Sequence, residues 1–113
     1  MDKIITMKLL AGPFEAILTD QKSVEVRLND EKRREIKVGD LIQFSLEPEL
    51  KQSVTVKVTE LLQYHTFYEL HDACGADCFR NKTKEEFESI IFSIYSKEQE
   101  SRYGVLGIRF IKL

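Results

Sequence analysis

Residues 22–28 read KSVEVRL, and residues 36–46 read IKVGDLIQFSL. In the first stretch, two valines and a leucine alternate with polar residues, which predicts a strand with one buried face. In the second, a Gly-Asp turn precedes an alternating run over residues 41–46. Short strands joined by a charged loop, with no helix between them, argue against a doubly wound parallel sheet. This region therefore favours an α+β fold with a mixed or antiparallel sheet.

The flanking sequence supplies the remaining elements. Apolar alternation predicts further strands at residues 4–9, 53–62 and 103–111. Helical spacing and capping boxes predict helices over 13–20, after Thr66 and over 83–95, the last with the apolar stripe Phe87, Ile90, Ile91 and Ile94. The order β-α-β-β-β-α-α-β fits a barrel of about five strands with flanking helices.

Length, charge and cysteine content bound the possible functions. The 113 residues fit one domain spanning 1–113. The formal net charge of −2 excludes phosphate binding by bulk charge, so nucleic-acid binding would require a local basic patch. No apolar run approaches the roughly 20 residues that cross a bilayer, so we expect no membrane contact. Cys74 and Cys78 make no disulfide framework, and a reducing cytoplasm is the expected location.

Three polar residues form the candidate binding or catalytic constellation. Glu25 and Arg27 are two apart on a predicted strand, so their side chains point the same way, and Lys22 immediately precedes that strand. Arg27 can grip a phosphate or carbonyl through paired N–H donors. Glu25 can accept a proton if burial raises its pKa, and Lys22 can act as a nucleophile or base. The alternative is an ordinary salt-bridged strand edge facing solvent.

Further ligand contacts are predicted from two other places. Arg102 and Tyr103, expected at the start of the last strand, can add a cation and a stacking ring to the same cleft. The basic run Lys32-Arg33-Arg34 can hold a phosphate backbone, although its acidic neighbours also fit a solvated loop. Tyr95, at the end of the helical stripe, is predicted to belong to the core.

Metal and cofactor sites are not expected. His71, Cys74 and Cys78 lie close in sequence, but a Cys-x3-Cys spacing without a second pair is a poor match to zinc sites. The sequence also contains neither a phosphate-binding glycine loop nor a Gly-x-Ser-x-Gly elbow. We therefore predict no metal and no cofactor.

The order and spacing of these segments resemble the ASCH domain family. The similarity rests on residues 22–27 after a short helix, on residues 36–44, and on the carboxy-terminal run RYGVLGIRF at 102–110. This resemblance implies a PUA-like barrel, a cleft where the first helix meets the following strand, and RNA binding. Some small members resemble amidases that deacylate acylated cytidine. Lys22 matches their lysine, whereas Glu25 stands in place of their threonine and Arg80 near the position of their glutamate.

Three functions remain open from the sequence. The first is recognition of RNA or a modified nucleoside in a cleft lined by Lys22, Glu25, Arg27, Arg102 and Tyr103. The second is hydrolysis, either of N4-acylated cytidine or of RNA, through Lys22 and Glu25. The third is an interaction module without a ligand of its own. The sequence does not decide whether the protein is an enzyme.

Overall fold

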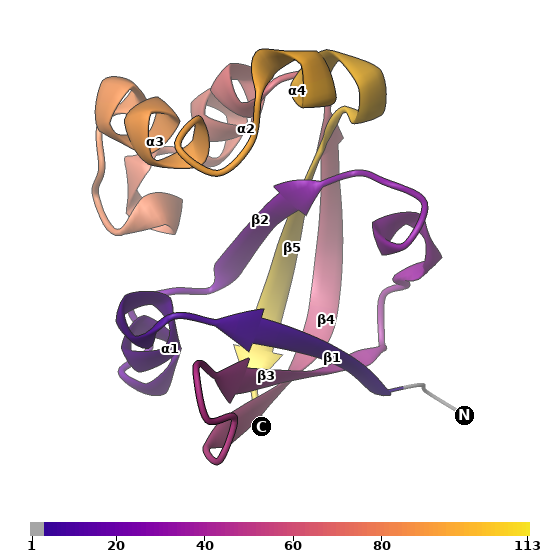
Figure 1. The fold of residues 1–113 in the computed structure, drawn as a ribbon, viewed down its shortest axis with the longest axis vertical. Helices are drawn as coiled ribbons and strands as arrows, with labels where there is room; N and C mark the ends of the chain where they lie inside the picture. The colour runs from indigo at the N-terminus through magenta and orange to yellow at the C-terminus, as the bar shows by residue number, and fades with distance from the viewer. Residues whose placement is uncertain (1–3) are drawn as a thin grey trace.

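Five strands form one sheet in the computed structural model, which describes residues 4–113. They are β1 (Ile4–Leu9), β2 (Val24–Leu28), β3 (Leu41–Leu46), β4 (Ser53–Tyr64) and β5 (Val105–Lys112). Their order in the sheet is β1-β3-β4-β5-β2, with β1 parallel to β3 and each other pair antiparallel. The mixed sheet curves into a half-barrel with β1 and β2 at its edges (Figure 1). The predicted α+β class and five-stranded, barrel-like architecture are confirmed.

Helices lie at both ends of the half-barrel. Helix α1 (Ala11–Leu18) lies beside the start of β2, and the short η1 (Arg33–Glu35) follows that strand (Figure 1). At the opposite end, residues 67–103 form a helical cap of α2 (Phe67–Cys74), η2 (Ala76–Phe79), α3 (Lys84–Ile91) and α4 (Lys97–Tyr103). In residues 4–113, no helix has the length and hydropathy that a bilayer crossing requires.

Two apolar clusters hold these layers together. The first fills the half-barrel beneath α1 and is built from residues such as Phe14, Ile42, Phe44, Val56 and Ile108. The second fixes the helical cap to β2 and β5 and includes Val24, Phe67, Leu70, Phe87 and Val105. Strand β2 therefore contributes apolar side chains to the cap cluster while it forms one edge of the sheet.

The first and third helices differ from their predicted bounds. Helix α1 begins at Ala11, before the predicted start at residue 13, and includes Pro13 in its first turn. Proline is tolerated there because an N–H in the first turn would have no helical carbonyl acceptor. Helix α3 keeps its Thr83–Glu86 capping box but ends at Ile91 instead of residue 95. Its predicted stripe is split, since Phe87 and Ile91 are buried, whereas Ile90 and Ile94 are 44% and 65% exposed.

Helix α4 is absent from the sequence-based prediction. It lies between the predicted helix over 83–95 and the predicted strand over 103–111, so Arg102 and Tyr103 close a helix instead of opening a strand. The helix has no buried residue and thus no apolar periodicity, the signal on which the prediction depended. Its capping box, Ser96 with Gln99, is nevertheless visible in the sequence. Strand β5 starts only after Gly104, whose φ of 72° favours glycine.

Candidate functional site

A cleft of about 390 Å³ lies between α1, β2 and the helical cap. Its volume is within the range of about 300–1,000 Å³ typical of small-molecule sites. Residues 24–27 of β2 form the floor, the end of β1 and the start of α1 form one wall, and the segment from Cys78 to Tyr95 forms the other. Figure 1 shows β2 running between α1 and α3. The family resemblance implied a cleft where the first helix meets the following strand, but it implied neither the contribution of β1 nor the wall from the cap.

Lys22, Glu25 and Arg27 meet on the floor of this cleft. The Lys22 Nζ atom lies 2.9 Å from Glu25 Oε1, and the Arg27 Nε atom lies 2.7 Å from Glu25 Oε2. Their side chains are 15%, 7% and 17% exposed, so this triad is largely removed from solvent. The expected same-side geometry on β2 is present, but the solvent-facing strand edge is not.

The two cations fix the charge of Glu25. Burial by itself would raise the pKa of this carboxyl, but Lys22 and Arg27 lower it below its ordinary value through their charges and hydrogen bonds. Glu25 is therefore ionised at neutral pH. A carboxylate with a lowered pKa and a cation on each oxygen is a weak proton acceptor, which opposes the general-base role considered from the sequence.

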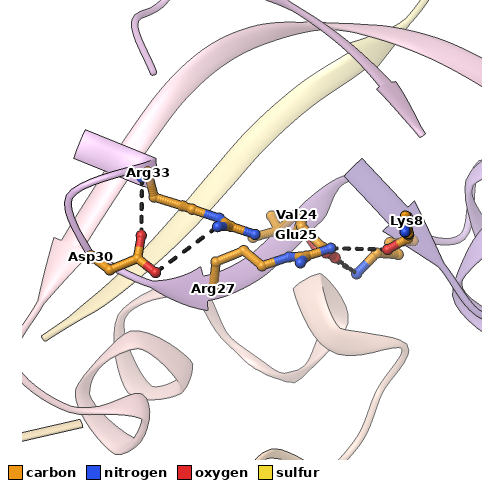
Figure 2. A network of polar contacts seen from close by, with 7 residues as sticks. Lys8, Val24, Glu25, Arg27, Asp30 and Arg33 are labelled. Carbon is orange, nitrogen blue, oxygen red and sulfur yellow. Dashed lines mark hydrogen bonds and ion pairs between the residues drawn. The ribbon is translucent and has the colours of Figure 1, made fainter. Parts of the chain in front are cut away.

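Arg27 also joins the two edges of the sheet. Besides its contact with Glu25, it donates from Nη2 to the backbone carbonyl of Lys8, 3.2 Å away on β1 (Figure 2). Lys22 donates to the carbonyl of Val24 at 3.0 Å in the same network. The bond from Arg27 links β1 to β2, which do not pair with each other in the sheet. The triad is consequently held in place by backbone on both sides of the cleft.

Three further basic residues surround the triad. Lys8, Arg80 and Lys82 line the cleft, and within residues 4–113 none of them has an ion-pair partner within 4 Å. In the sequence analysis, Arg80 appears only near the position of a family glutamate. Lys8 was missed because a single lysine on a strand carries no motif; only the fold brings β1 to this wall.

Aromatic and apolar side chains complete the cleft wall. Tyr95 lines the cleft and stacks on Phe67, with ring centroids 5.9 Å apart. It therefore belongs both to the cap cluster and to the cleft surface. Burial, opposed in part by Arg27, raises the pKa of its hydroxyl, which keeps it protonated as a donor. Ile90 and Ile94 provide apolar surface on the same wall.

The basic run at 32–34 lies outside the cleft lining. Arg33 and Arg34 belong to η1, and Asp30 contacts both the backbone N–H of Arg33 at 3.1 Å and its guanidinium at 3.9 Å (Figure 2). Arg34 donates to the carbonyl of Asn29 at 2.8 Å, and Lys32 is exposed. None of Lys32, Arg33 and Arg34 therefore lines the cleft, although the charge of Arg33, like that of Arg27, acts on Tyr95 in the cleft wall.

Arg102 and Tyr103 line a second hollow of about 700 Å³, formed by the end of α4 and neighbouring parts of β4 and α2. The Arg102 guanidinium stacks 5.3 Å from the Tyr103 ring. Glu100, in the same hollow, accepts a bond from the backbone N–H of Phe67 at 2.8 Å. The expectation that Arg102 and Tyr103 share a cleft with Lys22 and Arg27 is wrong, because α4 turns them to another face.

The cysteines do not form a metal site with neighbouring residues. Among residues 4–113, no group of three or more histidine, cysteine or acidic side chains is placed to bind a metal ion. Cys78 lines the cleft and donates from Sγ to the carbonyl of Cys74 at 3.2 Å. Burial, with Cys78 beside it, raises the pKa of Cys74 to about 11, so this thiol stays protonated and unreactive near neutral pH.

Comparisons with known proteins agree with this architecture. A family model described as the ASCH domain matches residues 7–113. The crystal structure of hypothetical protein PH0355 is 34% identical, with a TM-score of 0.86, and the match covers 98% of this chain and 99% of that one. The solution structure of protein PF0455 from Pyrococcus furiosus is 33% identical, with a TM-score of 0.73 and 97% of each chain covered.

A more distant structure shares the fold alone. A mutant of ZmASCH from Zymomonas mobilis is 13% identical with a TM-score of 0.60, over 95% of this chain and 66% of that chain. No curated protein matches the chain.

Proposed function

Because the chain belongs to the ASCH domain family, we propose that it binds RNA or a nucleoside in the cleft between α1, β2 and the helical cap. Members of this PUA-like family are generally regarded as RNA-binding. Lys22, Glu25 and Arg27 would form the polar floor of the site, and the cap wall would cover the ligand.

The buried triad is the observation that carries this proposal. It contains two cations and one carboxylate, and their side chains are at most 17% exposed. Partly buried charge is costly unless it is paired, and this group has one positive charge in excess. A polar ligand with oxygen acceptors would complete its hydrogen bonds. Protein sites that combine apolar walls with a few convergent polar groups are typical ligand sites.

Hydrolysis in the same cleft, of N4-acylated cytidine or of RNA, has weaker support. The amine of Lys22 and the carboxylate of Glu25 do lie together, as that mechanism would require. However, Glu25 is held ionised with its pKa lowered and both oxygens engaged by cations. Such a carboxylate removes a proton from water poorly. We therefore place recognition ahead of catalysis.

The proposed setting is a reducing cytoplasm. Cys74 and Cys78 are both free thiols in the structure, and reduced cysteines are typical of that compartment.

A single titration series tests the function. Cytidine, N4-acetylcytidine and a short single-stranded RNA are added to the wild type and to a Lys22→Ala/Arg27→Ala variant, and each mixture is followed by chromatography. The matched control is Lys37→Ala/Lys57→Ala, which removes the same charge from exposed positions outside the cleft. Circular dichroism verifies that all three proteins are folded.

The outcomes separate the candidate functions. Binding without product, weakened only in the Lys22→Ala/Arg27→Ala variant, would establish recognition in this cleft. Product that disappears in the same variant would instead make the protein an enzyme. Failure of every ligand to bind the folded wild type would contradict the proposal and favour an interaction module.

A further inference from the structure

The cleft carries a surplus of positive charge that the rest of the chain lacks. Five basic side chains line it, namely Lys8, Lys22, Arg27, Arg80 and Lys82, against the two acidic residues Glu25 and Glu47, a formal surplus of three positive charges. The whole chain has a net charge of −2. The positive potential is therefore local, and clefts lined by one sign of charge concentrate ligands of the opposite sign.

The acidic side chains of the cleft do not neutralise its surplus of positive charge. Glu25 already uses one oxygen for Lys22 and the other for Arg27, so it is not available to the remaining cations. Arg80 and Lys82 have no ion-pair partner within 4 Å among residues 4–113. A neutral ligand would leave this surplus unchanged, whereas an anionic ligand would remove it.

Arg80 and Lys82 are held on a constrained loop. Arg80 and Asn81 both have positive φ values, 56° and 58°, which non-glycine residues seldom adopt. The carbonyl of Lys82 accepts a bond from His71 Nε2 at 2.8 Å, and the His71 ring stacks on Phe79 at 5.2 Å. Unfavourable backbone of this kind persists where surrounding contacts impose it, and it occurs frequently at ligand sites. The two cations are thus presented to the cleft from a fixed backbone.

The cleft wall next to this loop is apolar, in contrast to the charged loop. Ile90 and Ile94 line the cleft and are 44% and 65% exposed, although both belong to the apolar stripe of the sequence. Exposed apolar surface beside cations fits a ligand with a flat apolar part and an anionic part. Inorganic phosphate would use the cations but leave the isoleucines uncovered, and a free nucleoside would do the reverse.

We infer that the ligand of this cleft is a nucleotide, with its phosphate at Arg80 and Lys82 and its base against Ile90 and Ile94. This inference rests on the proposed function and narrows its ligand from RNA or a nucleoside to one whose bound unit carries a phosphate. Free mononucleotides and the terminal nucleotide of an RNA share this chemistry.

Calorimetric titration provides the test. The common ribonucleosides, their 5′-monophosphates, inorganic phosphate and a 5′-phosphorylated tetranucleotide RNA are each titrated into the wild type. The same ligands are titrated into Arg80→Ala/Lys82→Ala and into the control Lys37→Ala/Lys57→Ala. The alanine at 82 keeps the carbonyl that His71 contacts, and thermal unfolding verifies the fold of each variant.

At least one monophosphate should bind about tenfold or more tightly than its nucleoside and than inorganic phosphate, since each charge-assisted contact contributes on this scale. Arg80→Ala/Lys82→Ala should lower monophosphate affinity about tenfold or more and so remove that advantage, whereas the control should keep it. Added salt should weaken monophosphate binding more than nucleoside binding. Tighter binding of the tetranucleotide would identify RNA as the source, and equal or weaker binding would identify free nucleotides.

Three results would overturn the inference, and they differ in which part of the proposed function they leave intact. Equal affinity for nucleosides and monophosphates would contradict it while retaining the proposed nucleoside recognition. Absence of binding by every nucleoside, nucleotide and RNA would remove both. An undiminished phosphate advantage in the folded Arg80→Ala/Lys82→Ala variant would show that these two residues are not the phosphate contacts.

Discussion

The cleft beside β2 and the hollow beside α4 differ in charge and in how their polar residues are held. In the cleft, five basic side chains face two acidic ones, and the central carboxylate is buried between two cations. The second hollow has two acidic side chains, Glu69 and Glu100, and the single cation Arg102, which is exposed. The larger hollow is therefore the poorer candidate for an anionic ligand. Charge placement and burial distinguish a candidate site better than volume does.

The largest expected difference between the two regions is in stability. Replacing Glu25 by alanine would leave two largely buried cations without their carboxylate, and breaking such a buried pair costs about 3–5 kcal/mol. In the second hollow, Glu100→Ala removes one acceptor from the N–H of Phe67, at a cost of about 1–3 kcal/mol. Urea denaturation of both variants measures the two costs. Equal losses in the free energy of unfolding would mean that the triad contributes no more to stability than the contact between Glu100 and the N–H of Phe67.

A second comparison concerns ligand affinity and depends on the proposed function. Arg27→Ala should weaken binding by about ten- to a hundredfold, because it removes a charged contact and the link to β1. Arg27→Lys keeps the charge but replaces the rigid fork of guanidinium N–H donors by a single ammonium, so it should bind at an intermediate level. Calorimetry with the ribonucleoside 5′-monophosphates and the 5′-phosphorylated tetranucleotide RNA measures both affinities. Full affinity in Arg27→Ala would exclude this residue from the site.

The pH dependence of stability isolates the contribution of Glu25. A carboxyl whose pKa is lower in the folded state than in the unfolded state stabilises the fold above the unfolded value, near 4.5. That contribution is lost as the pH falls through the folded pKa. The stability advantage of the wild type over Glu25→Gln should therefore shrink below about pH 4.5, as measured by urea midpoints from neutral to acidic pH. A constant difference across this range would indicate that Glu25 is not ionised in the fold.

The smallest effect is expected in the second hollow. Arg102→Ala/Tyr103→Ala should change ligand affinity by less than about threefold, since neither residue lines the cleft and exposed charges act weakly at a distance. The titrations that assess Arg27→Ala also measure this variant. A large loss of affinity in this variant, with the fold intact by circular dichroism, would show that the cleft and the second hollow belong to one binding surface.

The sequence alone predicted secondary structure and side-chain direction wherever a pattern extended over a few neighbouring residues. The period-two alternation of residues 23–28 placed Glu25 and Arg27 on one side of β2, and Lys22 followed from its position just before the strand. The capping box at Thr83 and Glu86 likewise marked the start of α3. In each of these cases, backbone geometry fixes the relation between side chains that are close in sequence.

Only the tertiary structure decided what those side chains meet. The sheet order brings the Lys8 carbonyl of β1 to Arg27 of β2, although 19 residues separate them. The cap places Arg80 and Lys82 opposite α1, and α4 turns Arg102 and Tyr103 to another face. The burial that opposes the ionisation of Glu25 also comes from these distant segments, whereas the two cations that keep it ionised are its sequence neighbours Lys22 and Arg27. Sequence periodicity indicates the direction in which a side chain points. The neighbours of that side chain and the dielectric environment around it depend on contacts between remote parts of the chain.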